Sequence, residues 1–134
     1  MRDVMDYEKQ HQKGKFHAYE RIEMLLDKDS FCELEADTFS VVNNKVMKKD
    51  GVIIGYGKIK GKMVCVYAQD FTVCGGTLGY KHGKKIADII KYAIKFNCPV
   101  IGINDSGGAR IQEGIKALTM YGEIFYSNTM ASGV

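Results

Sequence analysis

The sequence predicts an α/β protein whose elements follow the order strand, strand, helix, strand, helix. Two strand-like segments, residues 51–59 and 63–69, are separated by the short turn Lys-Gly-Lys. An amphipathic helical pattern then covers about residues 80–96, and the all-apolar run "CPVIGIN" follows it. A second helical pattern continues to about Asn128. A hairpin that feeds a right-handed crossover of this kind predicts a sheet with helices packed against it.

The composition is that of a soluble globular domain with a core of its own. The 134 residues are 46% hydrophobic and 26% charged, and the net charge of +3 comes mostly from scattered lysines. Scattered charge is typical of a solvated surface rather than a nucleic-acid interface, so no nucleic-acid partner is expected. No apolar run reaches the length of about 18 residues that a membrane span needs, and the polar N-terminus is unlike a signal peptide. We therefore expect a cytoplasmic protein with no direct membrane insertion.

The four cysteines, Cys32, Cys65, Cys74 and Cys98, contain no C-x-x-C pair. Three of them lie within or beside apolar runs, where a buried, reduced thiol is the usual outcome. We expect free thiols and no bound metal, zinc in particular.

Two regions are expected along the chain, an N-terminal helical and extended segment (residues 1–50) and the α/β unit (residues 51–134). Residues 16–26 carry apolar side chains at helical spacing, and the polar residues 27–30 end that helix. The lysine-rich stretch that follows, to Asp50, has no clear pattern.

Each element of the α/β unit has its own signal. The second strand is apolar on both faces, so we expect it to be covered on both sides. The helix of residues 80–96 has one apolar stripe and ends at Asn97 and Pro99. The second helix is predicted from the apolar residues Ile111, Ile115, Leu118, Tyr121 and Phe125.

Residues 106–110, with the sequence Ser-Gly-Gly-Ala-Arg, stand where a buried strand ends and a helix begins. That is a favoured ligand position in open α/β sheets. Free amides at a helix start attract negative charge, and Gly107 and Gly108 lack side chains that would keep a ligand away. One interpretation is an oxyanion cradle, in which one donor can contribute about 3 kcal/mol to catalysis. The other is a tight, well-packed turn, and the spacing does not choose between them.

Three sharper motifs fail at this turn or match only in part. The glycine spacing of a phosphate loop is present, but no Lys-Ser or Lys-Thr follows, and no G-x-G-x-x-G fingerprint is found. A serine-nucleophile elbow matches by half, because Asn104 rather than glycine precedes Ser106 by two residues while Gly108 follows it. A hydrolase that uses Ser106 with His82 therefore stays open as a minor alternative.

Residues 70–79 form a second glycine-rich loop, which contains Gly75 and Gly76. Its main chain could approach a ligand, or it could be only a flexible connection.

The runs "DFTVCGGTLGYKHGKKI" and "CPVIGINDSGGARIQEGI" closely resemble the carboxyltransferase family of biotin-dependent enzymes. Members include the β subunit of propionyl-CoA carboxylase and the α subunits of methylmalonyl-CoA and glutaconyl-CoA decarboxylases. The segment "GKFHAYERIEMLLDKDSFCELE" is also similar to the opening of that family, so the resemblance runs from about Gly14 to Val134. Tyr19, Asp29 and Cys74 depart from the usual family pattern, which bears on local packing more than on membership. The four-cysteine zinc ribbon of the bacterial acetyl-CoA carboxylase β subunit is missing, which favours the propionyl- and methylmalonyl-type branch.

The resemblance implies a crotonase-like fold, a spiral of ββα units preceded by N-terminal helices. Residues 51–134 would be the first part of a truncated CoA carboxyltransferase N-terminal domain. The implied reaction moves a carboxyl group between carboxybiotin and the α-carbon of an acyl-CoA, either propionyl/methylmalonyl-CoA or acetyl/malonyl-CoA. The implied cofactor is biotin, carried as carboxybiotin on a partner protein, with no metal. The implied partners are a biotin carboxyl carrier protein and a biotin carboxylase or membrane decarboxylase subunits, and complete family members are homo-oligomers.

The resemblance also implies roles for the two glycine loops. The amides of Gly108 and Ala109 would stabilise the oxygen of a thioester enolate, with Ala109 as the best single candidate. Arg110 could face a CoA phosphate or could pair with a nearby carboxylate. The residues expected to bind substrate are Ser106, Gly107, Arg110, Gly75 and Gly76.

Family chains run several times longer and include a second homologous domain. We therefore expect this chain to be a fragment, from a natural or an artificial truncation, with no turnover by itself. Robust decarboxylation of malonyl-CoA with free biotin would contradict that expectation. A non-catalytic CoA-binding module is the main alternative to an enzyme fragment.

Overall fold

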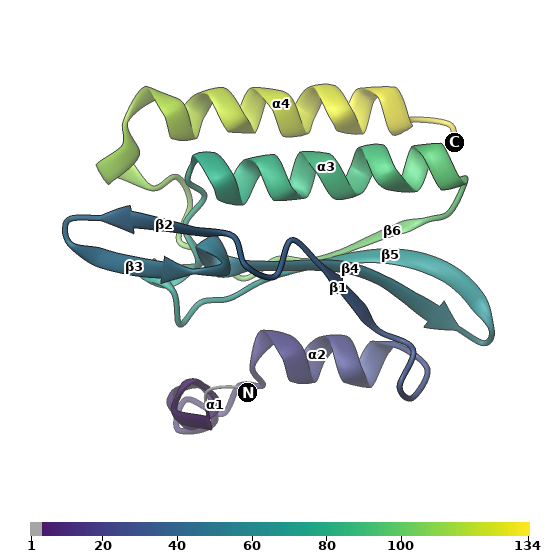
Figure 1. Cartoon of the computed structure of the whole chain (residues 1–134), viewed down its shortest axis with the longest axis horizontal. Helices are drawn as coiled ribbons and strands as arrows, with labels where there is room; N and C mark the ends of the chain where they lie inside the picture. Colours follow the sequence, from purple (N-terminus) through teal and green to yellow (C-terminus); the bar gives the residue numbers. More distant parts are fainter. Residues whose placement is uncertain (1–3) are drawn as a thin grey trace.

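The computed structural model of the protein describes residues 4–134, with side chains from residue 7 onward, and its elements form layers around a central sheet (Figure 1). The helices are α1 (Val4–His11), α2 (Ala18–Leu25), α3 (Tyr80–Phe96) and α4 (Ile115–Ala131). The strands are β1 (Cys32–Leu34), β2 (Phe39–Val42), β3 (Lys45–Lys48), β4 (Val52–Ile59), β5 (Lys62–Gln69) and β6 (Val100–Ile103). Short 3₁₀ turns are η1 (Lys49–Gly51), η2 (Cys74–Gly76) and η3 (Ile111–Glu113).

The main sheet has the strand order β1–β4–β5–β6. β4 runs antiparallel to β1 and β5, whereas β6 is parallel to β5. α3 connects the parallel pair; together with α4 it lies on one side of the sheet, and α2 lies on the other (Figure 1). The predicted α/β class and the predicted order of elements, with helices at the N-terminus, are confirmed.

The hairpin between β4 and β5 is the one that the sequence predicts. Lys60 and Gly61 form its turn with φ angles of 51° and 77°, and Ile59 pairs with Lys62. Two residues with positive φ match the twist of a type I′ hairpin. The strands continue to Val52 and Gln69 without a break in register.

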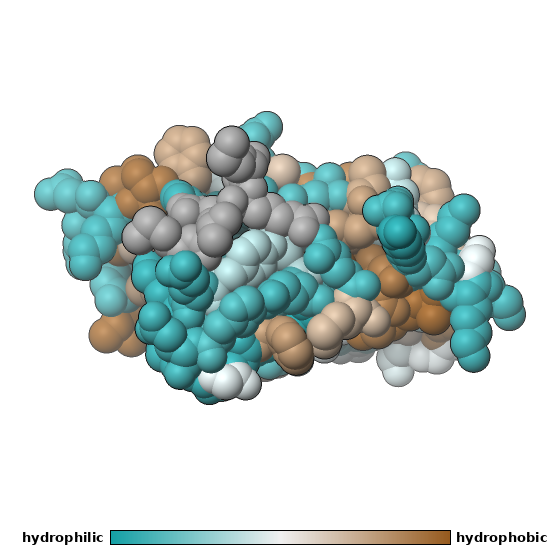
Figure 2. Space-filling view, turned by 90° about the horizontal axis from the view of Figure 1, so that it is seen from below, coloured by the Kyte–Doolittle hydropathy of each residue, from teal (hydrophilic) through white to brown (hydrophobic). Residues whose placement is uncertain are grey.

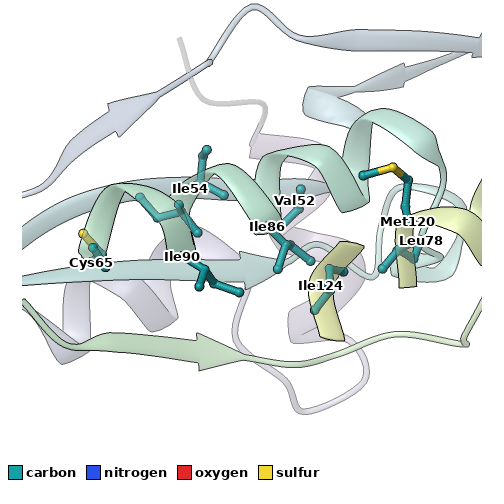
Figure 3. Close-up of a cluster of buried hydrophobic side chains, with 10 residues drawn as sticks. Val52, Ile54, Cys65, Leu78, Ile86, Ile90, Met120 and Ile124 are labelled. Atoms are coloured by element: carbon teal, nitrogen blue, oxygen red, sulfur yellow. The ribbon is translucent and has the colours of Figure 1, made fainter. Parts of the chain in front are cut away.

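Two hydrophobic clusters pack against opposite faces of the sheet, which explains why β5 is apolar on both. One cluster joins β4 and β5 to α3 and α4, with Ile54, Ile86 and Ile124 among its members (Figure 3). The other joins the same strands to α2 through Ile22 and Val66. The predicted covering of β5 on both sides is confirmed.

Part of residues 1–50 belongs to the same packing unit. β1 pairs with β4, and α2 supplies Ala18 and Ile22 to the second cluster. The stretch before Asp50, which shows no clear pattern in the sequence, contains the β2–β3 hairpin. Its turn is Asn43-Asn44, with φ angles of 49° and 61°, and asparagine is the non-glycine residue that best tolerates this conformation.

The boundaries of both long helices are close to prediction, but α4 buries a different face from the one the pattern indicates. Asn97 ends α3 in the left-handed conformation (φ 51°). Gly114 (φ 58°) separates η3 from α4, so Ile111 is not part of the helix. Four residues of the predicted apolar stripe are exposed, namely Ile111 (83%), Ile115 (76%), Leu118 (62%) and Phe125 (64%). The face of α4 toward α3 is made of Ala117, Met120, Ile124 and Ser127.

Seen from the side of α1 and α2, the surface is mostly hydrophilic, with separate hydrophobic patches (Figure 2). Over residues 4–134, none of the helices has both the length and the hydrophobicity needed to cross a membrane.

Candidate functional site

The two glycine-rich loops lie side by side and are joined by main-chain hydrogen bonds. The Gly107 N–H donates to the Gly75 carbonyl oxygen at 2.9 Å. The Leu78 N–H donates to the Gly108 oxygen, and the Arg110 N–H donates to the Leu78 oxygen, both at 2.9 Å. Residues 70–79 therefore hold residues 104–110 in place, and the site is built from both loops.

Among residues 107–110, one main-chain amide has no acceptor in the part of the chain that the structure describes. Gly107 and Arg110 donate to main-chain oxygens, and the Gly108 N–H donates to Oγ of Ser106 at 3.0 Å. Leu78 and Ala109 form a parallel β-bridge in which Leu78 bonds to the residues on either side of Ala109. The N–H of Ala109 therefore points away from Leu78, and it has no acceptor among residues 4–134. The turn is at least partly open to solvent from Ser106 to Ala109.

The glycines of the two loops differ in what they do. Gly108 has a φ of 112°, and a Cβ placed on it would meet nothing within 4 Å, so the space above it is open. A Cβ placed on Gly75 (φ 64°) would also have open space around it, with only the Phe71 ring, 4.0 Å away, near it. Gly76 is buried, and a Cβ there would lie 2.3 Å from the Asp105 carbonyl oxygen. Gly76 therefore permits the loops to dock, whereas Gly75 and Gly108 border open space. Gly107 is exposed, but a Cβ on it would contact the Gly75 oxygen and the Thr77 methyl group, both at 3.7 Å.

The expectation that Arg110 binds substrate must be corrected, because its side chain points into the protein and not toward a ligand. Its side chain is fully buried and forms ion pairs with Asp50 and, at 2.9 Å, with Glu113. It also donates to the Thr77 carbonyl oxygen at 2.8 Å. Burial acts to lower the pKa of the guanidinium, but the bonds with Asp50 and Glu113 raise it above its ordinary value. Of the two roles considered for Arg110, the structure shows the carboxylate pairing.

A buried polar network supports the turn from behind. The Asp50 carboxylate contacts Arg110 and accepts the His82 N–H at 3.1 Å. The Gln69 amide nitrogen lies 3.2 Å from Nε2 of His82, and its oxygen accepts the Asp105 N–H at 3.0 Å. The chain of contacts thus runs from Asp105, directly before the turn, to Arg110 at its end, through side chains of η1, β5 and α3.

The hydrolase alternative fails on this geometry. His82 is fully buried, and both of its ring nitrogens are engaged, Nδ1 with the Asp50 carbonyl oxygen (2.8 Å) and Nε2 with Gln69. Ser106 is exposed, and its Oγ accepts the Gly108 N–H. His82 is therefore not placed to act as a base for Ser106.

The buried imidazole of His82 should make the folded chain less stable at acidic pH. Burial lowers its pKa to about 4, helped by the nearby charges of Arg110 and Lys85. Because the unfolded chain takes up this proton near pH 6.5 and the folded chain does not, stability falls as the pH decreases between these values. We expect the free energy of unfolding to be about 2 kcal/mol lower at pH 5 than at pH 7 from this group alone. Urea unfolding at both pH values measures it.

The control for this prediction is His11→Gln, because His11 is exposed. His82→Gln should flatten the pH dependence, and His11→Gln should leave most of it. Burial acts to raise the pKa of Asp70, but bonds from His17 and Thr72 keep it below its ordinary value. Protonation of Asp70 therefore lowers the stability of the fold only at more acidic pH than this experiment uses. An unchanged slope in His82→Gln would show that His82 is not the group responsible.

The sequence reasoning missed the supporting residues Asp50, Gln69 and Glu113. No motif marks them, and Asp50 lies 60 positions before its partner Arg110. The weak available signal was the Arg110 side chain itself, since a buried guanidinium needs carboxylate partners. Among the residues that the structure describes, no group of three or more His, Cys, Asp or Glu could hold a metal ion.

Comparison with known proteins now identifies the family. The profile of the carboxyl transferase domain matches residues 9–134. The chain belongs to the carboxyl transferase domain family. The matched region includes α2, both glycine loops and α4, together with the last residues of α1, and the family predicted from the sequence motifs is confirmed.

Relatives and solved structures of this family agree with the assignment. The propionyl-CoA carboxylase beta chain of Saccharopolyspora erythraea is 53% identical over 131 residues, which are 94% of this chain and 24% of that protein. The methylmalonyl-CoA decarboxylase subunit alpha of Veillonella parvula is 50% identical over 132 residues, 95% of this chain and 26% of that protein. A transcarboxylase 12S structure with methylmalonyl-coenzyme A and methylmalonic acid bound superposes with a TM-score of 0.91 at 41% identity, covering 97% of this chain and 26% of that one. The chain therefore spans about a quarter of the length of these relatives.

A more distant member of the structural family has the same fold. The Pseudomonas malonate decarboxylase hetero-tetramer, solved with malonate, superposes with a TM-score of 0.78 at 28% identity and covers 84% of this chain and 45% of that one.

Proposed function

We propose that this chain is the acyl-CoA-binding part of a biotin-dependent carboxyltransferase and that its Ala109 N–H stabilises the thioester enolate. The observation that carries the proposal is the open amide of Ala109, the one donor of residues 107–110 left without an acceptor among the described residues. It lies beside the open space above Gly108, where a planar thioester has room.

The chemistry needs a donor at this position because removal of the α-proton puts negative charge on the thioester oxygen. A rigid amide stabilises that charge more than it stabilises the neutral carbonyl group, which lowers the barrier. The Gly107–Gly75 and Arg110–Leu78 bonds supply the rigidity, since they fix the main chain on both sides of Ala109. The amide of Gly108 is a second donor in this proposal, once the Ser106 hydroxyl that it now contacts turns away.

Biotin, brought as carboxybiotin by a carrier protein, supplies the carboxyl group in this proposal. Gly75 and Gly107 are the residues of this chain best placed to border it, because neither carries a side chain, Gly75 flanks open space and Gly107 is exposed. Gly76 and Arg110 are left out of the contact set, since both are buried. Their part is to hold the loops together.

The partners are also proposals. The names of the relatives support a propionyl- or methylmalonyl-type substrate. The transcarboxylase is described as a hexamer and the malonate decarboxylase as a hetero-tetramer, which supports a multi-subunit assembly. We infer that this assembly is cytoplasmic and includes a biotin carboxyl carrier protein. Catalysis by such an assembly would use this chain together with the parts of the enzyme that it does not span.

Calorimetric titration of the 134-residue chain with two ligands tests the proposal. Propionyl-CoA carries the thioester oxygen, and propyl-CoA is the matched thioether without it. A single net hydrogen bond predicts that propionyl-CoA binds about two- to tenfold more tightly. Equal affinity for the two ligands would favour the non-catalytic CoA-binding module, and no binding of either would contradict both.

A further inference from the structure

Two cysteines that are distant in sequence face each other on the side of the sheet that α3 covers. Cys65 is on β5 (Figure 3), and Cys98 lies in the segment between α3 and β6. Their sulfur atoms are 3.4 Å apart. The main chain holds both residues in place, because the Cys65 N–H donates to the Pro99 oxygen at 2.9 Å and the Cys98 N–H to the Ala93 oxygen at 3.1 Å.

The two thiols differ in their access to solvent. Cys65 is fully buried, and burial together with the contact from Cys98 raises the pKa of its thiol to about 12. Cys98 is half-buried and lines an open hollow of about 430 Å³ between α3, β6 and the end of α4, with Ile94 and Val100 beside it. A small oxidant in this hollow meets Cys98 first, and Cys65 lies directly behind it.

We propose that Cys65 and Cys98 form a dithiol modification site that a hydroperoxide converts to a disulfide. The Cys98 sulfur attacks the peroxide O–O bond, giving a sulfenic acid on Cys98 and releasing an alcohol, or water from hydrogen peroxide. The Cys65 sulfur then attacks the Cys98 sulfur, and the hydroxyl group leaves with the Cys65 proton as water. Both thiols lose one hydrogen, and the peroxide is reduced by two electrons.

The reaction requires only a small movement. A disulfide has a sulfur–sulfur distance of about 2.05 Å, so the two atoms must approach by roughly 1.4 Å from their present 3.4 Å. The cross-link would join β5 to the segment that precedes β6. Residues 104–110 follow directly after β6. This inference is independent of the proposed function, since neither thiol contacts the turn.

The experiment uses the 134-residue chain with Cys32→Ala and Cys74→Ala, so that only the pair remains. The reduced protein is treated with hydrogen peroxide, and its thiols are counted and its peptides mapped by mass spectrometry without reduction. We expect both thiols to disappear together, with a peptide that joins Cys65 to Cys98, and dithiothreitol to restore them. Cys98→Ala in the same background should leave Cys65 reduced.

The contrary outcomes are specific. Oxidation of Cys98 to a sulfinic acid with Cys65 still reduced would overturn the proposal. So would survival of both thiols at a peroxide concentration that oxidises Cys32, an exposed thiol, in the unsubstituted chain. A cross-link that forms equally well in urea would also overturn it, because it would then owe nothing to the fold.

Discussion

Replacing Ala109 by proline is expected to lower the turnover of a carboxyltransferase that contains this chain by about 10²–10³-fold, the usual effect of losing one oxyanion donor. Proline has no N–H. The Ala109 N–H has no acceptor in residues 4–134, so the substitution breaks no hydrogen bond that the structure describes. The loss should fall on kcat rather than on KM, because the donor acts mainly on the charge of the enolate.

A chimera provides the enzyme for this measurement. The chain replaces the matching segment of the propionyl-CoA carboxylase beta chain of Saccharopolyspora erythraea, which is 53% identical to it. Ala109→Ser is the matched control, since it changes the side chain and keeps the N–H. Thermal melting of both variants checks the fold, and a proline variant that melts like its parent and keeps full kcat would rule out the Ala109 donor.

The parts of the fold that were predicted correctly are those encoded by local signals. The hairpin turn at Lys60-Gly61 and the end of α3 at Asn97 each depend on neighbouring residues with positive φ. The Asn43-Asn44 turn has the same kind of signal, but the short strands around it, exposed at Phe39, Val41 and Val46, carry little apolar contrast. Helix and strand positions could therefore be read from the sequence, except where a strand lacks a buried face.

The features that the sequence could not predict depend on contacts between residues that are distant along the chain. α4 is apolar around most of its circumference, so its periodicity could not decide between the stripe of Leu118 and Phe125 and the face of Met120 and Ile124. Packing against α3 selects the face of Met120 and Ile124, where the small side chain of Ala117 allows the two helices to approach closely. The geometry of the candidate site also depends on contacts between distant residues.

The motif locates the turn of residues 106–110. Which amide of residues 107–110 stays open follows from the bridge between Ala109 and Leu78, 31 positions earlier, and no local pattern encodes it. The role of Arg110 likewise depends on Asp50, which comes from a segment with no clear pattern.

Asp50→Ala is expected to lower the free energy of unfolding by about 3–5 kcal/mol, the usual effect of removing one partner of a buried ion pair. The side chains of Asp50 and Arg110 are both fully buried. Without the carboxylate, Arg110 keeps only Glu113 as a charged partner, and Ser40 and the His82 N–H lose an acceptor. Since small domains are stable by about 5–15 kcal/mol, this change removes much of the total. Urea unfolding at pH 7 measures it.

Two variants bracket the effect. Asp88→Ala removes a half-buried carboxylate at the surface that pairs with Lys84 at 2.5 Å, and it should change stability by less than about 0.5 kcal/mol. Asp50→Asn keeps an acceptor and tolerates the left-handed backbone at this position (φ 48°), so its effect should fall between the other two. If Asp50→Ala costs no more than Asp88→Ala, the buried pair does not hold the turn. If the order is as expected, hydrogen exchange of the amides of residues 104–110 should be faster in Asp50→Asn than in the unsubstituted chain. Arg110 directly follows Ala109, so a weaker bond from Arg110 to residue 50 should also make the Ala109 amide more mobile.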